Sequence, residues 1–138
     1  MAIDEGNHHD PFAIKTTAII DGDQWILNGK KVFVVDGASA DIILLAARTS
    51  GKSGESNGIS VFAANKDTTG LNITKISTAD SRNYANIEIS DLKLEQSALL
   101  GEQDLAGETL EKILDLGRIA ISAEMLGNTE EAFEVTVN

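Results

Sequence analysis

The sequence has no cysteine, a single proline, few aromatic residues and no long apolar run. Without cysteine the chain can form no disulfide, no thiolate nucleophile and no metal site built on thiolates. No stretch reaches the roughly 18 apolar residues that a membrane-spanning helix needs, and no basic-then-apolar leader stands at the start. Aromatic residues make up only 4% of the chain, which gives little support to a carbohydrate-binding sandwich. We therefore expect a soluble, cytoplasmic protein.

Basic residues are also scarce, with 11 Lys and Arg against 22 Asp and Glu and a formal net charge of −11. Contacts with phosphate groups need clustered Lys and Arg, so we expect neither nucleic acid nor an anionic membrane as a partner. The acidic residues are spread along the chain and predict a solvated surface. An apolar content of 42% in 138 residues indicates a globular chain with one core.

The stretch 25–37, WILNGKKVFVVDG, organises the predicted fold. We predict two strands, 25–27 and 32–35, joined by a hairpin turn at Asn28-Gly29, because Asn-Gly tolerates the positive φ angles of tight turns. Four consecutive apolar β-formers predict a second strand that is covered on both faces. Phe33 is the one ring in this run that could serve as a platform for a flat ligand. Its alternative role is packing in the core.

Further short strands follow at near-regular spacing and are separated by polar, glycine-bearing loops. We expect them at 13–20, 41–48, 59–63, 71–76 and 87–94. About seven short strands predict a mainly β fold, an antiparallel barrel or sandwich.

From about Leu105 the apolar residues recur at steps of three and four, which predicts a long C-terminal helix. Its apolar residues occupy several faces, so the helix needs more partners than one small barrel offers. We predict a β domain over 1–103 and, over 104–138, the first helix of a truncated helical domain.

Two adjacent histidines, His8 and His9, stand near the carboxylates of Asp4 and Asp10. Adjacent residues of an extended chain point to opposite faces, whereas metal sites draw converging ligands from separate elements. We therefore predict no metal site, with both histidines exposed in a loop.

Short motifs stand in a fixed order along the chain: TTA, GDQW, LNGKK, GASAD and AART between 16 and 49, then NGISVF at 57–62, LLG at 99–101 and LDLGR at 114–118. Together they resemble the middle β domain of acyl-CoA dehydrogenases, followed by the opening helix of the C-terminal domain. The resemblance implies a fragment of a flavoenzyme that desaturates acyl-CoA thioesters. In such enzymes a carboxylate base removes the α proton while the β hydrogen leaves as hydride to FAD. The resemblance also implies homo-oligomers formed through the C-terminal helices and electron-transferring flavoprotein as a partner of the parent enzyme.

By the same resemblance, Phe33, Val34 and Val35 lie along the isoalloxazine ring of FAD, and Ile3 and Asp4 approach its pyrimidine side. Two departures from the family pattern fall on these residues. The family's Thr-Glu-Pro reads Asp-Glu-Gly at 4–6, and the family's threonine near flavin N5 is Val35.

The resemblance further places Asp10 near the thioester-binding mouth and matches Asp115 and Arg118 to a D-x-x-R motif that helps to shape the acyl-CoA site. A surface pair on a helix is the alternative reading of Asp115 and Arg118. The family's catalytic glutamate lies beyond Asn138 or, in a minority of members, at the position of Gly117. We therefore predict no catalytic residue in this chain. A non-catalytic β-barrel interaction module is the alternative function.

Overall fold

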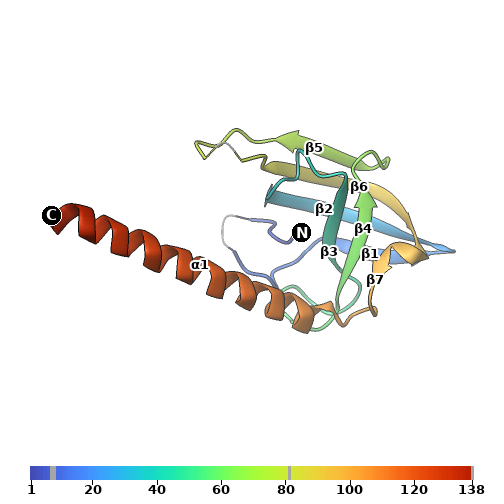
Figure 1. Ribbon diagram of the computed structural model, residues 1–138. Helices are drawn as coiled ribbons and strands as arrows, with labels where there is room; N and C mark the ends of the chain where they lie inside the picture. The colour runs from blue at the N-terminus through green and yellow to red at the C-terminus, as the bar shows by residue number, and fades with distance from the viewer. Residues whose placement is uncertain (7–8, 81, 138) are drawn as a thin grey trace. The chain divides into compact units, whose positions relative to one another are not determined.

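The computed structural model describes residues 1–6, 9–80 and 82–137 (Figure 1). These residues form short strands followed by one long helix. The elements are β1 (Thr17–Asp21), β2 (Gln24–Val34), β3 (Ile42–Arg48), β4 (Ile59–Asn65), β5 (Leu71–Lys75), β6 (Ala85–Glu95), the 3-10 turn η1 (Gln96–Ala98), β7 (Leu99–Leu100) and α1 (Ala106–Val137).

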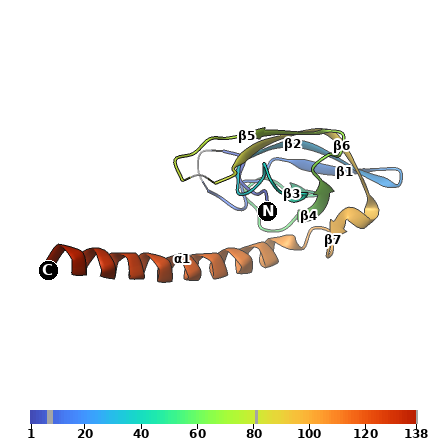
Figure 2. The same ribbon diagram turned by 45° about the horizontal axis from the view of Figure 1, so that its top comes forward.

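Within the described residues, the strands form one sheet in the order β5-β6-β2-β1-β3-β4-β7, as the two views of Figures 1 and 2 show. Neighbouring strands are antiparallel except β1 and β3, which meet in parallel at Thr17 and Arg48. The order is linear, with β5 and β7 at the edges, so the sheet does not close into a complete barrel. The prediction of a mainly β fold with about seven strands and a long final helix is confirmed.

The core lies between the two halves of this sheet. Trp25 of β2 packs edge-on against Phe62 of β4, with ring centroids 5.1 Å apart, and Leu92 of β6 joins the same buried cluster as Leu45 of β3. Side chains from the two halves therefore share one apolar core, as in a sandwich. Trp25 is only 3% exposed.

The chain divides into two compact units, Met1–Gly107 and the helical residues from Glu108 onward, and each is described by itself. The predicted domain boundary after residue 103 stays a prediction. No helix in the described part of the chain combines the length and the apolar character that crossing a membrane requires.

The hairpin predicted at Asn28-Gly29 is wrong, because β2 runs through both residues without turning. The chain reverses instead at Gly22, which has a φ of +61° and connects the paired strands β1 and β2. Gly29 marks a register shift in the pairing with β6. A Cβ atom at Gly29 would lie 2.7 Å from the Cα of Thr16, so the close approach of Thr16 requires glycine here.

The prediction that the second half of this stretch is covered on both faces is also wrong. Val34 is buried, but the side chains of Phe33 and Val35 are 58% and 51% exposed. A second register shift lies between Lys31 and Val34. It changes which residues face the core, and a continuous apolar run in the sequence does not reveal such a change.

Candidate functional site

A buried ion pair fastens the opening segment of the chain to β2. Lys31 Nζ donates to Glu5 Oε1 at 2.7 Å and to the carbonyl oxygen of Ile3 at 3.1 Å. The side chains of Lys31 and Glu5 are 0% and 8% exposed. The next residue of β2, Val32, donates its backbone N–H to the carbonyl oxygen of Asp4 at 2.8 Å. Residues 3–5 are therefore held against β2 by side-chain and backbone contacts together.

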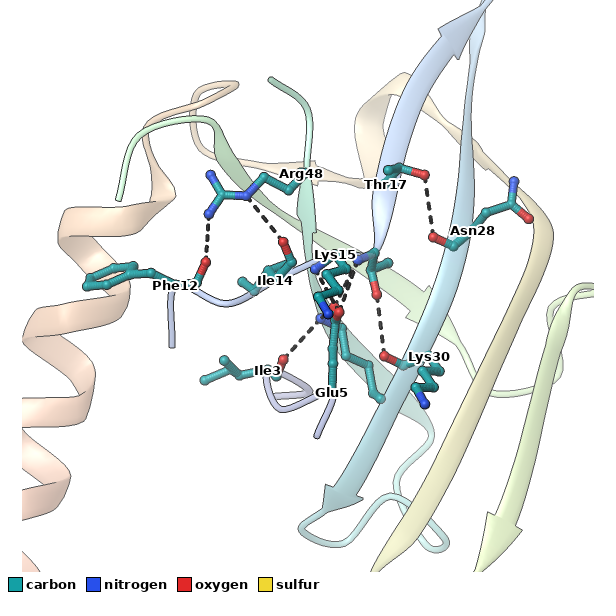
Figure 3. Close-up of polar contacts among 11 residues, drawn as sticks. Ile3, Glu5, Phe12, Ile14, Lys15, Thr17, Asn28, Lys30 and Arg48 are labelled. Atoms are coloured by element: carbon teal, nitrogen blue, oxygen red, sulfur yellow. Dashed lines mark hydrogen bonds and ion pairs between the residues drawn. The ribbon is translucent and has the colours of Figure 1, made fainter. Parts of the chain in front are cut away.

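The carboxylate of Glu5 also binds a third segment, where the chain enters β1. Its oxygens accept from the backbone N–H of Lys15 at 2.7 Å and of Thr16 at 2.9 Å. Figure 3 shows Ile3, Glu5 and Lys15 converging beside β2. One buried acidic side chain thus joins the opening segment, the start of β1 and β2, and most of its lone pairs are used.

Burial and ion pairing shift the pKa of Glu5 in opposite directions, and the same holds for the pKa of Lys31. Burial alone raises the pKa of Glu5, but Lys31 and the hydrogen bonds of Thr16 outweigh it and hold the Glu5 pKa below its ordinary 4.5. Burial lowers the pKa of Lys31 below 10.5, and the charge of Glu5 opposes that change. Each charge, 2.7 Å from the other, favours the ionised form of its partner.

A second buried cation, Arg48 at the end of β3, binds backbone carbonyl groups from two loops and is 6% exposed. Its guanidinium donates to the carbonyl oxygens of Phe12, Ile14, Glu55 and Asn57 at 2.8, 3.3, 2.6 and 2.6 Å. The contacts to Phe12 and Ile14 are drawn in Figure 3. Because a guanidinium offers five N–H donors in a rigid fork, one side chain fixes both loops.

Phe33 sits in a bulge on β2, next to the point where Asp4 is bound. Lys31 pairs with Ile87 of β6 and Val34 pairs with Ala85, so two residues of β2 oppose one residue of β6. Phe33 has a φ of +50°, a left-handed conformation that is uncommon for a residue other than glycine. Strained conformations of this kind concentrate at functional sites, where the surrounding structure holds them.

The structure brings the two groups of predicted cofactor residues together. The Asp4 carbonyl is bound to Val32, which directly precedes Phe33. Ile3 is 9% exposed and Val34 is 4% exposed, so their side chains belong to the interior, whereas Phe33 and Val35 are exposed. The Asp4 carboxylate is 30% exposed and lies 2.8 Å from Nδ1 of His9.

The predicted substrate residues fall in both units of the chain. Asp10 accepts the backbone N–H of Phe12 at 3.0 Å and lines an open hollow of about 440 Å³ with Glu5 and Thr16. Asp115 and Arg118 form an exposed ion pair at 2.5 Å, one helical turn apart on α1. They belong to the helical unit, so their convergence with Asp10 on one substrate stays a prediction.

Metal ligands do not gather in the part of the chain that the structure describes, where no three His, Asp or Glu side chains are placed to share an ion. The side chain of His9 is 48% exposed. Among the Asp and Glu side chains that the structure describes, it is paired with that of Asp4. His8 lies outside the described residues.

Sequence reasoning missed the buried cations Lys31 and Arg48. For Lys31 a signal was present, because counting in twos from the inward-facing Trp25 and Leu27 reaches Lys31 before the bulge changes the phase. Its partner Glu5 lies 26 residues away, and no local pattern connects the two. The role of Arg48 depends on loop carbonyl groups that no sequence pattern identifies.

Comparison with known proteins identifies relatives along nearly the whole chain. The family description "Acyl-CoA dehydrogenase, middle domain" matches residues 3–96. The human short-chain specific acyl-CoA dehydrogenase, mitochondrial, is 31% identical over 136 residues, which cover 96% of this chain and 33% of the human protein. The chain thus spans about one third of the length of the curated relatives it matches.

Solved structures give the same result for the fold. An acyl-CoA dehydrogenase from Geobacillus kaustophilus superposes with a TM-score of 0.72 at 32% identity, over 80% of this chain and 30% of that one. A glutaryl-CoA dehydrogenase from Mycobacterium smegmatis, solved in complex with FADH2, superposes with a TM-score of 0.66 at 26% identity, over 77% of this chain and 27% of that one.

Proposed function

The chain belongs to the acyl-CoA dehydrogenase family, and on that premise we propose that it supplies the β-domain part of an FAD and acyl-CoA site. The enzyme containing that site would be an oxidoreductase that desaturates acyl-CoA thioesters. Because the chain spans about a third of its relatives, this activity is proposed for the whole protein.

The proposal rests on the exposed face formed by Phe33 and Val35, which lies beside Asp4, whose backbone is hydrogen-bonded to β2. An isoalloxazine ring is flat and largely apolar, and it would cover an aromatic ring and a branched side chain that are now open to water. Val34 would contribute only its backbone, because its side chain is buried. Ile3 would likewise position the segment rather than touch the ligand with its side chain.

Asp4 would lie at the pyrimidine side of the flavin, where its carboxylate can accept a hydrogen bond from a ring N–H but cannot donate one. Pairing with His9 at 2.8 Å limits the freedom of that carboxylate. Lys31 and Glu5 would hold the Asp4 backbone in register with Phe33. The residues present therefore fit a flavin through stacking and acceptance of hydrogen bonds.

A bound flavin would take up the hydride that leaves the β carbon of the substrate. Asp10, Asp115 and Arg118 would contribute to binding of the acyl-CoA. Gly117 stands where a minority of the family carries its base and offers no side chain to remove the α proton. The base would come from a part of the protein outside this chain.

Two further features of the whole protein are proposed on the same grounds. Apolar side chains such as Leu116, Leu126 and Phe133 are exposed along α1, so we propose that copies of the protein assemble through this helix. Electron-transferring flavoprotein is proposed as the partner that reoxidises the flavin. The cytoplasmic location expected from the sequence stays a prediction, and the human relative carries the word "mitochondrial" in its name.

The test is a titration of the purified chain with FAD, followed by flavin fluorescence. We expect saturable binding that Phe33→Ala weakens about tenfold, the order of magnitude of one lost aromatic stacking contact. Val61→Ala, a change in the middle of β4, serves as a control that leaves the proposed flavin face intact. Binding that Phe33→Ala leaves unchanged would contradict the proposal and favour an interaction module.

A further inference from the structure

Asn86 of β6 is the residue that faces the bulge in β2. Its neighbours on both sides pair regularly, Ala85 with Val34 and Ile87 with Lys31. Val32 and Phe33 therefore lie opposite Asn86 alone, and the extra residue cannot keep the normal ladder of backbone hydrogen bonds. Two backbone N–H groups of β2 need partners from elsewhere.

Both groups find such partners. The N–H of Val32 donates to the carbonyl oxygen of Asp4 at 2.8 Å. The N–H of Phe33 donates to the side-chain Oδ1 of Asn86 at 3.3 Å. A side chain thus takes the place of a strand partner at the one non-glycine residue of β2 that has a positive φ, +50°.

This hydrogen bond decides where the ring of Phe33 points. An L-residue without such a constraint returns to negative φ, and its Cβ then projects in another direction. On its other side the ring meets Tyr84 edge-on, with centroids 6.4 Å apart and an interplanar angle of 72°. The Tyr84 hydroxyl lies 3.3 Å from Oδ2 of Asp80, to which it donates. Asn86 thus binds the backbone of Phe33, and Tyr84 contacts its ring.

We propose that Asn86 is a positioning residue for the flavin: its amide oxygen holds the Phe33 backbone in the left-handed conformation and so presents the ring as a stacking face. The inference rests on the proposed function and adds a residue that does not itself touch the cofactor. Asn86 is exposed and lies outside the core, so we expect its replacement to leave the fold intact.

The variants are chosen to separate the acceptor oxygen from the rest of the side chain. Asn86→Leu has nearly the same shape but no acceptor, and Asn86→Asp keeps an acceptor oxygen. Asn72→Leu is the matched control, because Asn72 of β5 makes a comparable exposed cross-strand contact to Glu88 at 3.3 Å, away from the bulge. Fluorescence of Trp25, the only tryptophan, verifies that every variant is folded.

Two measurements are made on each variant of the chain. Hydrogen exchange of the Phe33 amide, followed by NMR without ligand, reports the Asn86 hydrogen bond directly. An FAD titration followed by flavin fluorescence reports its consequence for binding. We expect Asn86→Leu to lose protection of the Phe33 amide and to bind FAD about fivefold more weakly, the effect of one hydrogen bond. Asn86→Asp retains the protection, and Asn72→Leu behaves as the unaltered chain.

The outcomes distinguish this inference from the proposed function. If the unaltered chain binds FAD and Asn86→Leu binds it equally well, the positioning role is refuted and the flavin site stands. If Asn86→Leu keeps the Phe33 amide protected, the hydrogen bond is not what holds the bulge, and the inference is again refuted alone. If the unaltered chain shows no binding of FAD, the proposed function and the inference fail together.

Discussion

Replacing Lys31 by methionine tests whether the buried pair holds the opening segment in place. Methionine has a similar length and fills most of the same space, but it leaves the Glu5 carboxylate, 8% exposed, without its cation. Removing one member of a buried ion pair typically destabilises a protein by about 3–5 kcal/mol. For a unit of this size, each kcal/mol corresponds to about 4–8 °C in Tm, so we expect a decrease of at least about 12 °C.

A double-mutant cycle separates the pair from the other contacts of Glu5. Glu5→Gln keeps an oxygen that can accept from the backbone N–H groups of Lys15 and Thr16, and it removes only the charge. The double variant lacks both charges of this pair, so it should be more stable than the sum of the single changes predicts, by about 2 kcal/mol. Urea unfolding followed by Trp25 fluorescence measures each corner of the cycle.

The same pair predicts a dependence on pH with a definite sign. The pKa of Glu5 is lowered in the folded protein, so its contribution to stability is present above about pH 4.5 and is lost as the pH falls through the folded value. The difference in unfolding free energy between the unaltered chain and Glu5→Gln should therefore shrink below pH 4.5. Lys66→Met is the control for Lys31→Met: it breaks the exposed pair with Asp41 and should change stability little.

A coupling energy between Lys31 and Glu5 below about 0.5 kcal/mol in the double-mutant cycle would refute the reasoning.

Two further predictions concern the strained bulge and the helix. The unfolding free energy of Phe33→Gly, measured with urea, should exceed that of Phe33→Ala by about 1 kcal/mol, because only glycine adopts a φ of +50° without strain. If the alanine variant is the more stable, residue 33 is not left-handed. The chain should associate through α1, on which Leu116 and Leu126 are 68% and 70% exposed, and light scattering at high protein concentration measures this; a monomer throughout would refute the proposed assembly.

Most of the strands were predictable because they are short apolar or alternating runs that end at a turn residue. The expected strand at 41–48 and the observed β3, Ile42–Arg48, differ by a single residue. The helix was equally clear, since no proline follows Leu105. These features depend on local sequence alone, which is why they were found.

The path of β2 was not predictable in the same way. Asn28-Gly29 and Asp21-Gly22 both have the sequence of a tight turn, and only the second is one. Gly29 is explained by the backbone of Thr16, which packs where a Cβ would stand. That contact comes from the tertiary structure, so a reading of turn residues cannot distinguish the two cases.

The candidate site shows the same limit. The resemblance predicts Phe33 and Asp4 as cofactor residues, but the contacts that hold their segments join residues distant in the sequence: Glu5 with Lys31, and Asn86 with Phe33. Residues Asp4-Glu5-Gly6 depart from the family's Thr-Glu-Pro, but the contacts that hold this segment to β2 do not depend on the changed side chains. Glu5 retains the family's residue type at the position that binds Lys31, whereas Asp4 contributes its backbone carbonyl, which any residue would supply.

We propose that the face formed by Phe33 and Val35 binds the flavin, and an FAD titration of the purified chain tests this most directly. We expect saturable quenching of flavin fluorescence, weakened about tenfold by Phe33→Ala and unchanged by Val61→Ala. Absence of saturable binding, or equal binding by the Phe33→Ala variant, would contradict it.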